Sequence, residues 1–186
     1  MEQVLALRHA TLPLRRTVAV LLGTALVALA AQVAVPLPGT PVPLTLQPLA
    51  VLIVGGVLGP WLGGASLVFY LALGAAGLPV FTPIGLPGVA RLIGPTGGYL
   101  LSYPLAAYAV GLLAGDGLRL GRLALAALLG LVLIHLGGLA QLLILTGSLA
   151  RAAQFGTVPF LSADLVKLVL AVLILRPTIP PARARL

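Results

Sequence analysis

Ser162-Ala163-Asp164-Leu165-Val166-Lys167 opens the last apolar stretch of the chain, and residues 168–175, which follow it, carry no charge. In a helix this spacing puts a carboxylate and an ammonium group three residues apart on one face. Lys167 is the only lysine, and Asp164 is the only one of the three acidic residues that lies against a hydrophobic segment. Charges at membrane depth cost roughly 2.5–3.5 kcal/mol each, so they are usually paired, face a cavity and serve a function. We therefore expect this pair to face a polar ligand pocket inside a helical membrane protein.

The composition places the whole chain in the membrane. Of the 186 residues, 60% are hydrophobic and 8% are charged, whereas about a quarter of a soluble domain is charged. The sequence therefore predicts a single integral membrane domain, residues 1–186. The net charge is +8, but the basic residues are dispersed between apolar segments, which argues against nucleic-acid binding. The chain has no cysteine, which excludes disulfides and thiolate chemistry.

The apolar segments predict an all-α fold of six transmembrane helices, with five or seven left open. The candidate spans are residues 17–35, 49–58, 61–77, 97–115, 123–146 and 159–175. Gly59-Pro60 separates the second from the third. Residues 36–48 must leave helical geometry, because four of their prolines, Pro36, Pro38, Pro41 and Pro43, each remove a backbone donor. Residues 78–95 form a second irregular connection, rich in proline and glycine and containing Arg91.

Charge placement predicts the orientation of a multi-pass protein in the cell membrane. Six spans that start inside put the tails, residues 1–16 and 177–186, in the cytoplasm. Eight arginines then lie inside and two outside, as the positive-inside rule requires. The inner ones are Arg8, Arg15, Arg16, Arg119, Arg122, Arg176, Arg183 and Arg185, and the outer ones are Arg91 and Arg151. The irregular connections share the outer side with Asp164 and Lys167, so we expect a pocket that opens outward beneath them.

Four further motifs are similar to those of a known protein family. They are Pro43-Leu44-Thr45-Leu46-Gln47, Gly77-Leu78-Pro79-Val80-Phe81, Gly94-Pro95-Thr96-Gly97-Gly98-Tyr99-Leu100, and Pro159-Phe160 ahead of Asp164 and Lys167. Together they resemble the BioY family, the biotin-specific S components of energy-coupling factor (ECF) transporters, over residues 20–175. The resemblance implies a six-helix S-component bundle that captures biotin from outside. It also implies a transmembrane coupling protein and two ABC ATPases as partners, in contact with membrane lipid. This chain has no nucleotide-binding motif and no expected cofactor, so the partners would hydrolyse ATP.

Biotin has ureido N–H donors, a carbonyl acceptor, an apolar bicyclic ring and a carboxylate. Asp164 can accept hydrogen bonds from the ureido group, and Lys167 or Arg91 can meet the carboxylate. Asp164 has two structural alternatives: a helix-start acid behind Ser162, or a simple ion pair with Lys167. Arg91 has one structural alternative, which is a solvated arginine in a loop.

Three other residues complete the candidate binding set, and a fourth borders it. The amide of Gln47 suits a ureido group, or it satisfies loop backbone instead. Tyr99 and Tyr103 share a helix face and predict either one pocket tyrosine or an interfacial aromatic belt. His135 lies in the middle of the fifth span without a second histidine or carboxylate at metal-ligand spacing, which favours a hydrogen-bonded structural role.

The function predicted from these observations is high-affinity biotin capture for uptake, without enzyme activity. The first alternative is the same fold serving another small carboxylated vitamin. An enzyme would need several convergent titratable groups, and only Asp164 and Lys167 qualify. A channel would need rings of repeated polar residues, which the sequence lacks.

Overall fold

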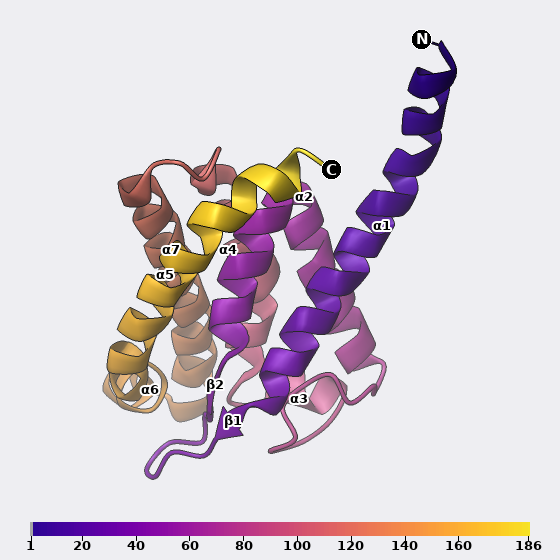
Figure 1. The fold of residues 1–186 in the computed structure, drawn as a ribbon. Helices are drawn as coiled ribbons and strands as arrows, with labels where there is room; N and C mark the ends of the chain where they lie inside the picture. The colour runs from indigo at the N-terminus through magenta and orange to yellow at the C-terminus, as the bar shows by residue number, and fades with distance from the viewer. Residues whose placement is uncertain (1) are drawn as a thin grey trace.

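The computed structural model describes residues 2–186, with side chains from Leu12 onward. Its helices are α1 (Glu2–Gln32), α2 (Gln47–Ala75), α3 (Val89–Ile93), α4 (Gly97–Ala114), α5 (Leu120–Thr146), α6 (Leu149–Gly156) and α7 (Leu161–Arg183). A 3-10 turn, Val158–Phe160, precedes α7. The strands β1 (Ala34–Val35) and β2 (Leu44–Thr45) pair in antiparallel fashion within the proline-rich connection. The predicted helical membrane fold is confirmed (Figure 1).

Helix α2 contains two membrane segments rather than one. Gly59 interrupts it with φ 81° and ψ −179°, a conformation that glycine adopts without strain, and Pro60 follows. The chain reverses direction there. The evidence is the close approach of the two halves: a Cβ atom at Gly63 would lie 2.9 Å from the Cα atom of Gly55. The described residues form five long apolar helical stretches. Dividing α2 at Gly59 brings the number of segments into agreement with the six predicted.

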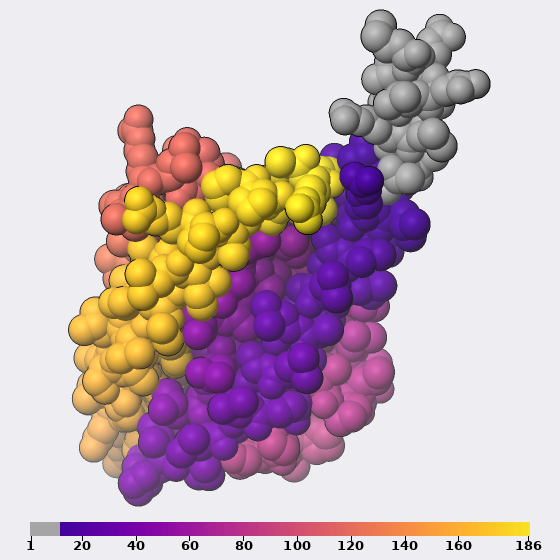
Figure 2. Space-filling view, viewed as in Figure 1, coloured from indigo at the N-terminus to yellow at the C-terminus, as the bar shows by residue number. Residues whose placement is uncertain are grey.

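The irregular connections converge on one end of the bundle, as predicted. In Figure 1 the β1–β2 pair, α3 and α6 all lie at the lower end, and both termini lie at the upper end. The C-terminal end of α7 reaches across the bundle to α1 (Figure 2), where Arg16 Nε donates to the Leu186 carbonyl at 3.3 Å. The polar pocket end and the arginine-rich end are therefore separated by the length of the helices.

The helix ends differ from the predicted boundaries. Residues 2–16 are helical as part of α1, and the side chain of Arg8 lies outside the described residues. Helix α7 continues to Arg183 through three prolines, Pro177, Pro180 and Pro181. Thr178 lies between these prolines, and its Oγ1 donates to the Ile174 carbonyl at 2.7 Å, one turn earlier in the helix. Helix α6 and the short β1–β2 pair were not predicted from the sequence.

Arg183, near the end of α7, hydrogen-bonds to the ends of two other helical segments. These contacts lie at the end of the bundle where both termini are found. Its guanidinium donates to the carbonyls of Gly56, Gly111 and Gly115 at 2.7, 2.9 and 2.6 Å. These carbonyls lie at the C-terminal ends of the first half of α2 and of α4, where carbonyl groups lack helical partners. The guanidinium thus satisfies backbone carbonyls that have no partner within their own helices.

We expect Arg183→Ala to lower the apparent Tm of the detergent-solubilised protein by roughly 5 °C, because about 2 kcal/mol of charged hydrogen bonds is lost. Arg176→Ala, at an exposed position of the same helix, is the matched control and should change the Tm by less than about 1 °C. Equal shifts for the two variants would show that the three carbonyl contacts contribute nothing to stability.

Candidate functional site

A cavity lies where the irregular connections meet the helix ends, and all six predicted site residues line it. Its volume, measured as the space open to the centre of a water molecule, is about 50 Å³. The predicted residues in the lining are Gln47, Arg91, Tyr99, Tyr103, Asp164 and Lys167. The lining also includes Val42, Pro43, Thr45, Pro48, Phe81, Thr82, Thr96, Leu100, Leu131, Ile134, His135 and Phe160. Residues from α2, α3, α4, α5 and α7, from the 3-10 turn and from the links between elements thus converge on one space.

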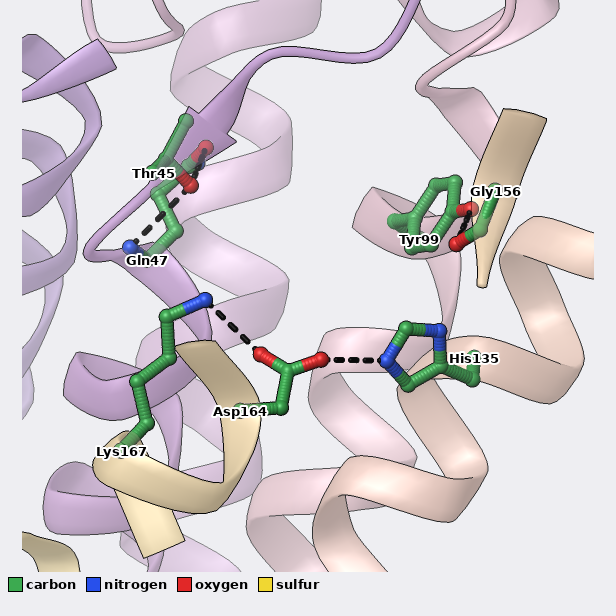
Figure 3. A network of polar contacts seen from close by, with 7 residues as sticks. All are labelled: Thr45, Gln47, Tyr99, His135, Gly156, Asp164 and Lys167. Atoms are coloured by element: carbon green, nitrogen blue, oxygen red, sulfur yellow. Dashed lines mark hydrogen bonds and ion pairs between the residues drawn. The ribbon is translucent and has the colours of Figure 1, made fainter. Parts of the chain in front are cut away.

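Asp164 is held by two partners (Figure 3). Lys167 Nζ donates to Asp164 Oδ1 at 2.8 Å, and His135 Nε2 lies 2.6 Å from Asp164 Oδ2. The exposed fractions of Asp164 and Lys167 are 7% and 5%, so the pair is buried at the cavity and not turned toward lipid headgroups. A buried charge that is paired and hydrogen-bonded is the form in which a membrane helix tolerates ionised groups. The ion pair expected as a structural alternative therefore exists, and it exists inside the cavity lining.

Gln47 begins α2 directly after β2, and its amide is bonded within the protein. Its Nε2 donates to the Tyr70 hydroxyl at 2.7 Å, and its Oε1 accepts from Thr45 Oγ1 at 3.3 Å. Figure 3 shows the Gln47 amide above the Lys167 ammonium group, on the side of the cavity opposite His135. An amide has two N–H donors and two acceptor lone pairs, so capacity remains for a ligand after these bonds.

Tyr99 and Tyr103 both line the cavity, which excludes the interfacial belt predicted as their alternative. They are 8% and 3% exposed. The Tyr99 hydroxyl donates to the carbonyl of Gly156, at the end of α6, and its ring lies edge-on to His135 with centroids 6.2 Å apart. Tyr99 therefore connects α4 to the segment that leads into α7.

Arg91 is buried in α3 and holds the connection that precedes it. Its guanidinium donates to the carbonyls of Ile84 and Thr82, the latter at 2.8 Å, while Nε is buried without a hydrogen-bond partner. Among the side chains described from Leu12 onward, it makes no ion pair with a carboxylate. Burial lowers the pKa of Arg91, and nearby Tyr70 opposes that shift. Arg91 is therefore a loop-organising cation that faces the cavity without a protein anion beside it, and not a solvated loop arginine.

Sequence reasoning left His135 out of the binding set, although it lines the cavity and contacts Asp164. The signal was available, because an ionisable residue inside a membrane span is functional by default. Phe81 and Phe160 were quoted as parts of motifs, and the structure puts both in the lining as an apolar wall. Thr45 belongs to the same group, since its hydroxyl orients the Gln47 amide.

Comparisons with known proteins agree with this architecture. The BioY family model matches residues 3–184. A "Probable biotin transporter BioY" of Pyrococcus horikoshii is 41% identical over 83% of this chain and 90% of its own length. A "Biotin transporter BioY" of Thermotoga maritima is 39% identical over 81% and 88%.

A solved structure gives the same result for the fold. It is the crystal structure of the S component for biotin from an ECF-type ABC transporter, which aligns with a TM-score of 0.80 at 26% identity. The alignment covers 89% of this chain and 90% of that one. With the family model, the relatives and the fold in agreement, the chain belongs to the BioY family.

Proposed function

We propose that this protein captures biotin from the outer side of the membrane and is the substrate-binding subunit of an ECF-type transporter. One observation carries the proposal: a buried anion, two buried cations and an aromatic wall meet in one cavity of a BioY-family chain. Biotin combines an N–H donor pair, an apolar ring and a carboxylate, so each lining group has a counterpart on the ligand. Relatives named as biotin transporters support the same substrate.

The contacts within the protein indicate which lining group suits which part of the ligand. The Asp164 oxygens accept one bond each from Lys167 and His135, which leaves lone pairs for the ureido N–H groups. Arg91 is the cation without a protein carboxylate partner among the described side chains, so it suits the ligand carboxylate best. Phe81 and Phe160 suit the bicyclic ring.

Biotin requires the cavity to expand. By the same measure as the 50 Å³ found here, one water molecule needs about 10–15 Å³, so the space corresponds to only a few waters. The lining contributed by the β1–β2 connection and residues 78–95 is the part not fixed within a spanning helix. We expect these two connections to move outward for entry and to close over the bound vitamin.

The coupling machinery belongs to partners in this proposal. A transmembrane coupling protein would contact the subunit in the bilayer, and two ABC ATPases would supply the energy. The arginines near the ends of α1 and α7 favour a cytoplasmic position for both termini, which puts the cavity outside.

Isothermal titration of the purified protein tests the proposal. Biotin and desthiobiotin, which keeps the ureido group but lacks sulfur, should both bind tightly, because the polar contacts do not involve sulfur. Absent or millimolar biotin binding would overturn the proposal. Tight binding of a different small carboxylated vitamin under those conditions would favour the alternative substrate.

Arg91→Ala should weaken biotin binding by roughly 10-fold, because a charge-assisted bond to the ligand carboxylate is lost. Biotin methyl ester has no carboxylate charge, so the same variant should change its affinity by less than about twofold. Arg151→Ala, an exposed arginine at the same end, is the matched control. Equal losses for biotin and its ester would limit Arg91 to holding the Thr82 and Ile84 backbone.

A further inference from the structure

We propose that His135 is a positioning residue for ligand binding: it fixes the orientation of the Asp164 carboxylate so that its free lone pairs face the ligand. This inference rests on the proposed function, because the acceptor role of Asp164 is part of it. His135 lies in α5, whereas Asp164 and Lys167 lie in the first two turns of α7. The bond between Nε2 and Oδ2 is thus the polar connection between these two helices at the cavity.

The two oxygens of Asp164 are held from different directions. Lys167 comes from the same helix and binds Oδ1, and it follows Asp164 through any small movement of α7. His135 comes from α5 and binds Oδ2, so it sets the carboxylate plane relative to the rest of the cavity (Figure 3). With one oxygen tethered, a carboxylate can still rotate about its terminal torsion, which has broad wells. With both tethered, rotation requires the loss of a charged hydrogen bond.

The space behind this bond is apolar and offers Asp164 no substitute partner. A cleft of about 360 Å³ between α5 and α7 contains His135 and Asp164 in its lining. Apart from these two residues and Thr157, its lining consists of leucine and valine: Leu128, Leu131, Val132, Leu136, Leu139, Leu161, Leu165 and Leu168. Without the imidazole, Oδ2 would border this cleft, where an unpaired charged oxygen is costly. We expect the carboxylate to turn away from the cleft and to lose the orientation in which its free lone pairs face the ligand.

Hydrogen-bonding capacity assigns the proton on the imidazole. An ionised carboxylate only accepts, so the nitrogen that faces Oδ2 carries hydrogen. The other ring nitrogen, Nδ1, is buried without a partner. His135 therefore holds Asp164 through the hydrogen that Nε2 donates to Oδ2, and the remaining lone pairs of the carboxylate stay available to the ureido N–H groups.

Three substitutions at His135 separate positioning from packing. His135→Leu removes the donor and should weaken biotin binding by about 10-fold or more. His135→Gln keeps an N–H donor with similar reach, and we expect its affinity to stay within about threefold of wild type. His135→Asn keeps the same chemistry on a shorter side chain that does not reach Oδ2, so it should resemble His135→Leu. Titration calorimetry gives the affinities, and thermal unfolding without ligand reports the folded state of each variant.

A double-mutant cycle identifies the route of the effect. If His135 acts through Asp164, His135→Leu should weaken binding by less than about twofold in an Asp164→Asn background. Wild-type affinity for His135→Leu, no rescue by His135→Gln, or a full additional loss in the Asp164→Asn background would each overturn the inference. A failure of the wild-type protein to bind biotin would instead overturn the proposed function, so the two failures are distinguishable.

Discussion

Replacing Asp164 with asparagine is expected to weaken biotin binding by roughly 100-fold, the largest loss of affinity for a single substitution in this protein. Asparagine keeps the size of the side chain but removes the negative charge. One of its two terminal atoms becomes an N–H₂ donor, which cannot accept from the ligand and which repels Lys167 Nζ or the His135 Nε2 hydrogen. The variant therefore loses the negative charge and one of the two acceptor atoms, and it disturbs one of the two groups that hold the side chain.

Titration calorimetry on wild type, Asp164→Asn and Asp116→Asn measures this effect. Asp116 is the matched control, because it is exposed beyond α4, at the opposite end of the bundle. Asp164→Ala is less informative by itself, since removal of one partner from a buried pair destabilises a protein by about 3–5 kcal/mol. Wild-type affinity in a folded Asp164→Asn protein would move the ureido-binding group to another part of the cavity.

Gly137→Ala should destabilise the protein, and it should reduce biotin binding at the same time. Helices α4 and α5 cross with two glycines in contact: a Cβ at Gly137 would lie 2.4 Å from the Gly98 carbonyl oxygen, and one at Gly98 would lie 2.0 Å from that of Gly137. Both obstacles are backbone, which cannot rotate away, so a methyl group forces the helices apart. Tyr99 and His135 lie next to this crossing, and their cavity-lining positions would shift with it.

A matched glycine in the same helix supplies the control. A Cβ at Gly121, in the first turn of α5, meets nothing within 4 Å. Gly121→Ala should leave the Tm unchanged or raise it slightly, because alanine favours helix by about 1 kcal/mol over glycine. Gly137→Ala should lower the Tm by roughly 5–10 °C, as overpacking of a close crossing costs about 1–3 kcal/mol. Equal Tm values for the two variants would mean that the crossing relaxes freely.

Much of the fold was predictable from the sequence, because a bilayer leaves few choices. Apolar segments must be helical there, so their number and the side on which the arginines gather follow from composition and order. The reversal inside α2 was also predictable, since Gly59-Pro60 interrupts an otherwise continuous apolar run. By contrast, α6 was hidden, because its eight residues are too short and too polar to produce a spanning signal.

The candidate site was predictable where residues that are rare in this chain mark it. Contacts between residues far apart in the sequence were not predictable. Asp164 and Lys167 are neighbours in sequence, so their pairing follows from helical spacing. The bond between His135 and Asp164 joins residues 29 apart on two helices, and it depends on how these helices are rotated against each other. Likewise, the contacts of Arg91 with Thr82 and Ile84 depend on loop geometry that has no repeating pattern.

The short first half of α2 determines how deep in the membrane the proposed biotin site lies. From Gln47 to Gly59 it covers about 18 Å at 1.5 Å per residue, whereas the hydrocarbon core is about 30 Å thick. With the reversal near the inner boundary, the Gln47 end stops about 12 Å below the outer one. The β1–β2 connection lies at the Gln47 end, so in the proposed orientation biotin would reach the cavity between protein segments and would not have to partition into lipid.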